Sequence, residues 1–220
     1  MYTLYWERMS GAIGPQALLE EIGAPYRIAP IDMAAGEHRE PAYRRINPLM
    51  RVPALALPGG TVVGETSAIT LVLAERHPEA GLVPAPGDND RPEFLFWLIG
   101  MATNGYPLFS RAWHPEQFTL DDSANETVRL VAERQLDEFF TIIENAIRGD
   151  ACFMQRGFTA LDIYVAMLTE WTADKHALFR KRPKLAALYG TVSSRPSYRK
   201  VMDQHSAPAP ALAEAAGSGQ

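Results

Sequence analysis

Apolar residues at the start of the chain fall into short runs and one helical stretch. Residues 2–6 form an apolar and aromatic run that is typical of a buried strand. Apolar residues at helical spacing follow in residues 17–22, with Pro15 near the start and Gly23 just past the end. Residues 25–31 predict a second strand. A strand, a helix and a strand at this spacing predict two parallel strands joined by a crossover helix.

The next stretch predicts a hairpin and a second helix. Pro53 precedes the apolar run Ala-Leu-Ala-Leu, and a Pro-Gly-Gly turn then returns the chain into the β-branched residues 61–63. Residues 65–67, Glu-Thr-Ser, offer cap chemistry before apolar positions at helical spacing in residues 68–73. The hairpin adds antiparallel strands to the parallel pair, and residues 40–46 predict a short helix in the connecting loop.

The second half of the chain has helical patterns throughout. A long one begins near Arg91, and Pro107 should kink or break it because proline removes a helical hydrogen bond. Residues 121–148 carry a long apolar face. Thr159 and Asp162 form a Thr-x-x-Asp capping arrangement, which assigns both residues to stability rather than catalysis. Two further helices are predicted, over residues 183–193 and 196–204.

These patterns divide the chain into two domains. We expect an α/β domain over residues 1–78, a proline-containing linker over 79–90 and an all-α helical domain over 91–205. Residues 206–220 are rich in Ala, Pro, Gly and Ser, and we expect a disordered tail there. A chain of 220 residues can bury a substantial core, and 47% hydrophobic with 21% charged residues is the composition of an ordinary soluble protein.

Charge and cysteine content argue against several classes of function. A net charge of -5 gives no electrostatic basis for binding nucleic acid. The apolar runs are short and interrupted by charge, and residues 1–20 lack a basic segment followed by an apolar core, so we expect neither a membrane span nor a signal peptide. Cys152 is the only cysteine; we expect a small hydrophobe in a loop or half-buried, in a protein of the reducing cytoplasm. The sequence shows no metal-ligand spacing, glycine-rich phosphate loop or serine nucleophile elbow.

Two places in the first domain could bind charged groups. The helix that follows Glu65 begins with free N–H groups and the positive end of its dipole, which favour a carboxylate, and Glu65 beside it suits an ammonium. Together they would suit a zwitterionic α-amino acid group; the alternative is that Thr66 or Ser67 only caps the helix. Ser10 lies where a strand end meets a helix start, where its hydroxyl could face an anion or simply cap the helix.

The motif order in this region resembles a known family. Residues 47–55, Asn-Pro-x-x-x-Val-Pro-x-Leu, a hairpin, and residues 65–69, Glu-Thr-x-Ala-Ile, resemble the glutathione-binding core of the glutathione S-transferase superfamily. The resemblance implies a thioredoxin-like α/β domain followed by an all-α domain. It also implies that Pro53 is cis, that the Val52 backbone pairs with the cysteinyl part of glutathione, and that Glu65 and Thr66 hold the γ-glutamyl group.

The resemblance extends to the sulfur and to the glycine carboxylate of glutathione. Ser10 occupies the position of the active-site serine of serine-type members, where one hydrogen bond could lower a thiol pKa from about 8.5, at roughly 1.4 kcal/mol per unit. The loop departs from the family at Gly11, where cysteine-type members carry cysteine. Residues 36–39, Gly-Glu-His-Arg, resemble a stretch that places cations near the glycine carboxylate, so His38 and Arg39 are candidates, with Arg51 alongside.

The resemblance also implies an electrophile pocket in the helical domain. Tyr106, Arg111 and Trp113 are the candidates for it, and packing within a helix bundle is the alternative. The implied function is transfer of an activated glutathione thiolate to small hydrophobic electrophiles, by conjugation or cleavage, in a cytoplasmic homodimer with a role in detoxification. Glutathione is then a co-substrate, and no metal is implied. Two alternatives stay open: a non-catalytic binding or scaffold protein on the same fold, and a glutathione-dependent ether lyase or dehalogenase.

Overall fold

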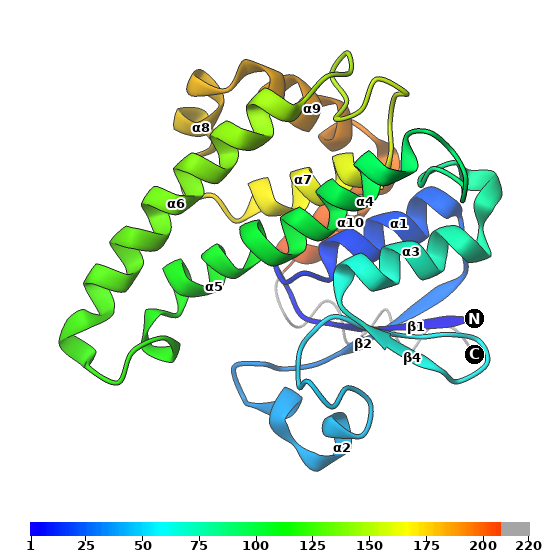
Figure 1. Ribbon diagram of the computed structural model, residues 1–220. Coiled ribbons are helices and arrows are strands. Elements are labelled where there is room, and N and C mark those ends of the chain that lie inside the picture. The colour runs from blue at the N-terminus through cyan, green and yellow to red at the C-terminus, as the bar shows by residue number, and fades with distance from the viewer. Residues whose placement is uncertain (208–220) are drawn as a thin grey trace. The chain divides into compact units, whose positions relative to one another are not determined.

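The computed structural model describes residues 1–207, and their contacts group them into two compact units (Figure 1). The first unit is Met1–Val83 together with the segment from Ser193 onward, and the second is Pro84–Val192. The domain boundaries expected from the sequence stay predictions, although the last helix, which we expected in the helical domain, groups by its contacts with the first unit. The expected disordered tail lies outside the described residues from position 208 onward.

The first unit is built on a four-stranded sheet in the order β2-β1-β3-β4. The strands are β1 (Tyr2–Trp6), β2 (Tyr26–Pro30), β3 (Ala54–Ala56) and β4 (Val62–Gly64). β1 runs parallel to β2 with Tyr2 opposite Tyr26, and antiparallel to β3 with Leu4 opposite Leu55. The predicted parallel pair and hairpin are therefore confirmed, and the first unit has the expected thioredoxin-like arrangement.

Four helices accompany this sheet: α1 (Ile13–Ile22), α2 (Pro41–Arg44), α3 (Thr66–Arg76) and α10 (Pro196–Ser206). Short 3-10 turns lie at Glu37–Arg39 and Pro78–Ala80. α1 and α3 lie side by side on one face of the sheet, and α2 lies beyond its other face (Figure 1). α1 ends at Gly23, which adopts the left-handed conformation (φ 72°) that glycine reaches without a steric penalty, as the sequence predicts.

The second unit is helical. It contains α4 (Arg91–Gly100), α5 (Tyr106–Trp113), α6 (Asn125–Ala146), α7 (Ala160–Glu170), α8 (Lys175–Lys181) and α9 (Pro183–Ser193). The predicted break near Pro107 is confirmed, because a π-helical turn at Met101–Gly105 separates α4 from α5. Gly105 in this turn allows a close approach to α6, since a Cβ atom there would lie 2.3 Å from Cζ of Phe139. The chain thus has the expected fold class, thioredoxin-like α/β followed by all-α.

The start of α7 is held by the predicted capping box. The Thr159 hydroxyl accepts from the Leu161 N–H, and the Asp162 carboxylate accepts from the Thr159 N–H at 2.7 Å. Asp162 also accepts from the Phe153 N–H at 2.6 Å, which ties the preceding loop to the helix. The side chain is fully buried, and this burial raises the pKa of Asp162 above its usual range. Cys152 is buried in that same loop.

Three features differ from the sequence expectations. α8 was not predicted; it is short, and its N-cap Asp174 accepts from the Ala177 N–H. α3 begins at Thr66 without any side-chain cap, so the expected capping role of residues 65–67 is wrong. α6 begins at Asn125, and Val131 and Ile142 from its predicted apolar face are exposed, because the helix is covered only along a narrower stripe.

Among residues 1–207, no helix is both long and apolar enough to span a membrane.

Candidate functional site

The turn between β1 and α1 is held by the Ser10 hydroxyl. Ser10 Oγ donates to the Glu7 carbonyl at 2.7 Å and accepts from the Ala12 N–H at 3.1 Å. A hydroxyl has one proton to donate, so it cannot serve the Glu7 carbonyl and a sulfur atom at once. The N-cap of α1 is Ala12 and the helix has no side-chain cap, so the capping alternative for Ser10 is wrong; its role at a sulfur stays a prediction.

The start of α3 lies against this turn. The Thr66 hydroxyl donates to the Gly11 carbonyl at 3.3 Å, a long contact that joins two segments more than fifty positions apart. The first N–H groups of a helix have no acceptor within it, so the start of α3 presents donors and a positive dipole end beside the turn. Thr66 is buried, whereas Glu65 before it is exposed.

Glu65 adopts an unusual backbone conformation. Its φ of 61° and ψ of 118° lie in a region that residues other than glycine rarely occupy. Such a conformation costs on the order of 1–3 kcal/mol and persists only where the surrounding structure enforces it. Met9 and Met50 also have positive φ, at 51° and 54°. Met9 and Met50 directly precede the predicted site residues Ser10 and Arg51, whereas a fourth such residue, Ala151, lies in the second unit.

The segment before Pro53 is fixed by two buried side chains. Tyr43 Oη and Asn47 Nδ2 both donate to the Arg51 carbonyl, each at 2.7 Å. Asn47 Oδ1 also accepts from the Leu49 N–H at 3.1 Å. Burial raises the pKa of Tyr43 to about 12, so its hydroxyl remains a donor at neutral pH. The Arg51–Val52 peptide is therefore held in one orientation.

The Val52–Pro53 peptide bond is cis, as the resemblance implies. Both residues are buried, but within the described residues neither the N–H nor the carbonyl of Val52 has a hydrogen-bond partner. A buried peptide is almost always paired, so these two groups are open to a partner from outside the chain. Val52 thus offers one donor and one acceptor, the set with which an extended peptide pairs.

His38 lies among cations. It is 8% exposed, its Nε2 accepts from Arg39 Nε at 3.2 Å, and its buried Nδ1 has no hydrogen-bond partner among the described residues. Burial, with the charges of Arg39 and Arg51, lowers the pKa of His38, and Glu7 opposes this shift. With Nε2 accepting, a neutral ring carries its proton on Nδ1, and this N–H has no acceptor among the described residues. The predicted trio is brought together.

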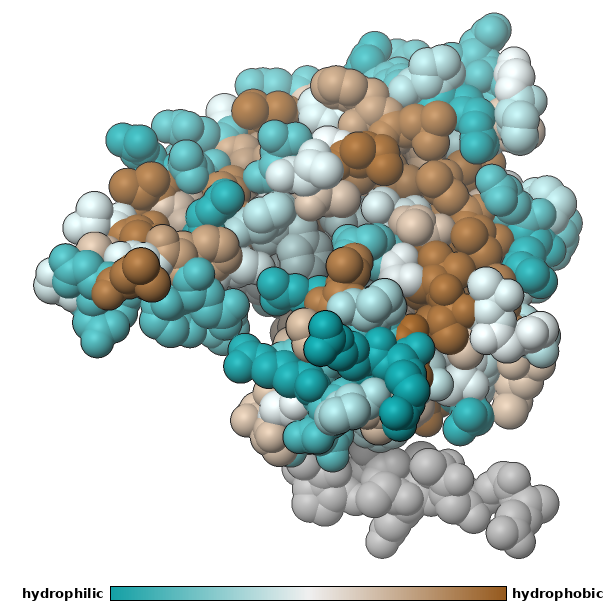
Figure 2. Space-filling model, turned by 60° about the horizontal axis from the view of Figure 1, so that its bottom comes forward, coloured by the Kyte–Doolittle hydropathy of each residue, from teal (hydrophilic) through white to brown (hydrophobic). Residues whose placement is uncertain are grey.

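The surface around this trio is hydrophilic. Arg39, Glu40, Arg44 and Arg45 are exposed on and beside α2. Figure 2 shows hydrophilic side chains gathered over this segment at the centre of the face that is turned forward. Anionic groups of a ligand would meet a mostly cationic surface here.

The three residues predicted for an electrophile pocket all lie on α5 in the second unit. Tyr106 packs edge-on against Trp171, with ring centroids 4.9 Å apart. The Arg111 guanidinium lies over the Phe118 ring at 5.6 Å. Trp113 is 61% exposed and contributes to the lining of a cavity of about 290 Å³ between α5, α6 and α8. A shared pocket for the three residues stays a prediction.

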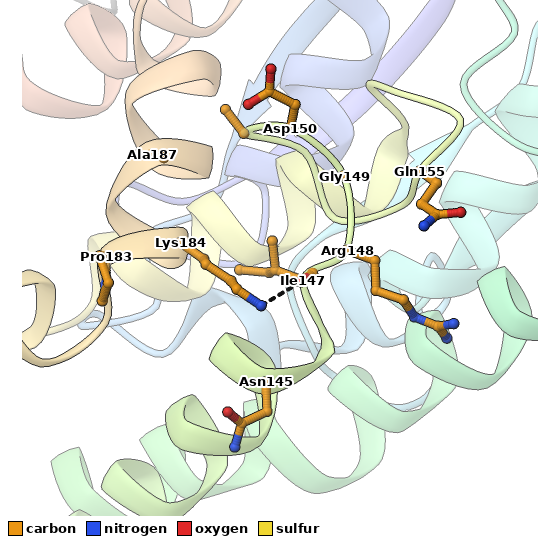
Figure 3. Close-up of a pocket in the computed structure, with 10 residues that line it drawn as sticks. Asn145, Ile147, Arg148, Gly149, Asp150, Gln155, Pro183, Lys184 and Ala187 are labelled. Atoms are coloured by element: carbon orange, nitrogen blue, oxygen red, sulfur yellow. Dashed lines mark hydrogen bonds between the residues drawn. The ribbon is translucent and has the colours of Figure 1, made fainter.

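A larger cavity of about 540 Å³ lies elsewhere in the second unit and contains none of the predicted site residues. Figure 3 shows that its polar side chains point in different directions instead of converging. Its two cations already have partners, since Lys184 Nζ donates to the Ile147 carbonyl at 3.2 Å and Arg148 pairs with Glu93. We therefore assign no site to this cavity.

Sequence reasoning missed the residues that hold the site in place. Asn47 belongs to the motif quoted above, but no role was predicted for it, and Tyr43 was not singled out. An aromatic residue four positions before an Asn-Pro pair is a weak signal. The convergence of both side chains on one carbonyl depends on the folded path of the chain.

Comparison with known proteins identifies the family that the first unit resembles. Residues 14–76 match the family model described as "Glutathione S-transferase, N-terminal domain". A GST-like protein of Escherichia coli K12, YncG, is 22% identical over 198 residues, which cover 89% of this chain and 94% of that protein. Residues 14–76 thus form a domain of the glutathione S-transferase family.

Other superfamily members cover most of the chain as well. Glutathione S-transferase 3 of maize is 24% identical to it over 193 residues, covering 84% of this chain and 85% of that protein. The solved structure of a glutathione transferase homologue from Sulfitobacter, with bound glutathione, superposes with a TM-score of 0.84 at 24% identity, covering 93% of this chain and 98% of that one. This structural likeness supports the glutathione S-transferase fold of the chain.

Proposed function

We propose that the chain binds glutathione in its first unit and transfers the glutathione thiolate to small hydrophobic electrophiles. The observation that carries the proposal is the unpaired backbone of Val52, two residues before Ala54, which pairs with Tyr5 of β1 and Gly64 of β4. Extended peptide segments pair through such a donor and acceptor. We propose that the cysteinyl unit of glutathione is the peptide segment that pairs with the Val52 backbone.

The charged ends of glutathione match the groups on either side. The γ-glutamyl carboxylate would meet the N–H groups at the start of α3, and Glu65 would pair with the ammonium. The glycine carboxylate would meet the charges of Arg39 and Arg51, and it would accept from His38 Nδ1 only after that buried atom becomes exposed. Each end of the ligand is thus offered a group of opposite charge, and the thiol is left towards the turn at Ser10.

The reaction needs little more than a thiolate and an oriented electrophile. The thiol loses its proton to solvent, its sulfur forms a bond to the electrophilic carbon, and the leaving group departs with its electron pair. For an electrophile without a leaving group, the carbon framework takes the electron pair and then a proton. The positive dipole ends of α1 and α3 favour the thiolate over the thiol. Ser10 can donate to it only by giving up the Glu7 carbonyl.

A non-catalytic role is the second possibility, and the same hydrogen bond favours it. If the Ser10 hydroxyl stays on the Glu7 carbonyl, the sulfur of bound glutathione would receive no side-chain donor from this turn. The protein would then bind glutathione with an unshifted thiol pKa. A lyase or dehalogenase would differ in the electrophile and share the same thiolate.

The deciding experiment is a titration of glutathione into the protein, followed by thiolate absorbance between pH 5 and 9. If the protein activates glutathione, binding should be saturable and the thiol pKa of bound glutathione should lie well below about 8.5. Glu65→Gln should weaken binding by roughly 10- to 100-fold, since a charged hydrogen bond contributes about 1.5–3 kcal/mol. Glu75→Gln, an exposed carboxylate on the same helix, is the matched control and should bind as the parent does. Absence of binding at millimolar glutathione would refute the proposal.

We further propose that Trp113 contacts the electrophile and that the protein forms a homodimer. Trp113→Ala should change the rate with an aromatic electrophile and leave glutathione affinity unaltered.

For the dimer, Phe96 and Ile99 on α4 are 67% and 45% exposed and offer an apolar surface for a second copy. Phe96→Glu should convert the dimer to a monomer in analytical ultracentrifugation. A cytoplasmic role in detoxification would follow from this chemistry.

A further inference from the structure

The last turn of α10 carries a buried histidine that reaches the turn before α1. His205 is fully buried, and Met9 N–H donates to its Nδ1 at 3.0 Å. On the other side of the ring, Nε2 lies 3.1 Å from Gln16 Oε1. The Trp6 ring packs against it with centroids 4.7 Å apart. One side chain thus joins α10 to β1, to the turn and to α1.

The contacts fix which nitrogen of His205 carries the proton. A neutral imidazole has one acceptor and one donor nitrogen. Because Met9 N–H donates to Nδ1, that nitrogen has the lone pair, and Nε2 then donates to Gln16 Oε1. Trp6 Nε1–H donates to the same oxygen at 2.8 Å. The 3.0 Å approach of Trp6 Nε1 to His205 Nε2 is therefore a close contact between two donors.

The ring remains neutral over the physiological range. Burial, helped by the charge of Arg8, lowers the pKa of His205 to about 3. A protonated ring would also present a second N–H to the Met9 N–H. The lone pair on Nδ1 is consequently available at any pH at which the protein would work.

The residue that His205 holds is the one before Ser10. Met9 has a positive φ of 51° and is 38% exposed. A second tie lies next to it, where Arg8 Nη1 donates to the Ala207 carbonyl at 2.8 Å. The left-handed turn is therefore fastened from the C-terminal helix at two consecutive residues.

α10 is itself anchored along α1. Arg195 forms two hydrogen bonds to the Glu21 carboxylate, at 2.6 and 2.7 Å. Lys200 pairs with Glu20 at 2.8 Å, and Gln204 bonds to Gln16. These ties begin near the start of the helix and end one residue before His205. The ring therefore has a fixed support from which to hold the turn.

We propose that His205 is a positioning residue, whose Nδ1 lone pair on α10 holds the Met9–Ser10 turn in the conformation that receives the sulfur of glutathione. The part that concerns sulfur rests on the proposed function, whereas the hold on the Met9 N–H does not. The inference makes the C-terminal helix part of the machinery that sets the thiol pKa.

Two amide variants separate the two sides of the ring. In His205→Asn the Oδ1 atom takes about the place of Nδ1 and can still accept from Met9 N–H, but the contact to Gln16 is lost. In His205→Gln the side-chain amide reaches the place of Nε2 and can still donate to Gln16, but nothing replaces Nδ1. Each variant deletes one contact and retains the other.

Hydrogen exchange at the Met9 amide is the first readout. We expect exchange at least tenfold faster in His205→Gln and within about twofold of the parent in His205→Asn, with both variants folded. His77→Gln is the control, because it also removes a histidine from this unit, one that bonds to Tyr2. Equal acceleration in the Asn and Gln variants, or none in either, would overturn the hold on Met9.

The thiol pKa of bound glutathione is the second readout. It should rise toward about 8.5 in His205→Gln and stay near the parent value in His205→Asn. A thiol pKa that is the same in both variants while Met9 exchange differs would overturn the link to sulfur. If the parent protein binds no glutathione, the proposed function fails and that link fails with it. The comparison of hydrogen exchange at the Met9 amide still tests whether His205 holds Met9.

Discussion

The two hydrogen bonds to the Arg51 carbonyl predict a non-additive pair of substitutions. Tyr43 and Asn47 are 3% and 5% exposed, so the carbonyl they share is covered by buried side chains. Tyr43→Phe removes one donor at nearly constant volume and should lower the free energy of unfolding by about 0.5–1.5 kcal/mol. Asn47→Ala removes two hydrogen bonds, to Arg51 and Leu49, and should cost about 1–3 kcal/mol.

The double variant should lose more than the sum of the two. Each single variant leaves the carbonyl with one donor, whereas the double variant leaves it with none, and an unsatisfied buried acceptor costs about 1–3 kcal/mol. Urea unfolding with matched slopes measures the coupling. Tyr2→Phe combined with Asn47→Ala is the control; Tyr2 bonds to His77, so this pair shares no partner and should add within about 0.5 kcal/mol.

The same variants test the site. Because the Arg51–Val52 peptide is oriented by this carbonyl, the double variant should bind glutathione at least tenfold more weakly under conditions where it is folded. Strict additivity of Tyr43→Phe and Asn47→Ala, together with unchanged glutathione affinity, would refute the reasoning.

Three further outcomes are expected. Asp162→Asn replaces one carboxylate oxygen, which accepts from N–H groups such as that of Phe153, with an NH2 group that cannot accept. The free energy of unfolding measured in urea should fall by about 2–4 kcal/mol. Burial raises the pKa of Asp162 above its unfolded value, so the parent's stability relative to this variant should be greatest below about pH 4 and fall as pH rises through the raised pKa. Ser10→Ala should raise the thiol pKa of bound glutathione by about one unit if the hydroxyl turns to the sulfur, and an unchanged pKa with activity intact would remove Ser10 from the mechanism. Gly105→Ala should lower stability by about 1–3 kcal/mol, since its Cβ would meet the Phe139 ring; a neutral result in thermal unfolding would contradict the close approach.

Local signals in the sequence predicted most of the fold. Gly23 ends α1, the Pro-Gly-Gly turn closes the hairpin, and Pro107 follows a break between helices. Each of these residues restricts its own backbone, so its effect is independent of distant contacts. α8 is not predicted from the sequence, because the hydrophobic periodicity of seven residues is too short to distinguish a helix from a loop.

The sequence identifies residues of the candidate site, but it does not predict which side chains contact one another there. The sequence identifies Val52, Glu65, His38 and Ser10, but it does not predict the hydrogen bond from the Ser10 hydroxyl to the Glu7 carbonyl. The hold of His205 on Met9 joins residues 196 positions apart. Nothing in the local pattern of either residue specifies the other, because burial and partner choice are set by tertiary packing.

The grouping of α10 with the first unit has a consequence for how the protein is made. Residues of β1, α1 and the turn leave the ribosome first, but the helix that covers α1 is translated roughly 110 residues after the rest of that unit, on the order of ten seconds later at ~5–20 residues per second. Glu20, Glu21 and Gln16 stay without their partners on α10 and in the residue before it throughout that interval. The first unit is thus begun first and completed last, and a nascent chain arrested before Pro196 would present an unfinished α1 surface to chaperones.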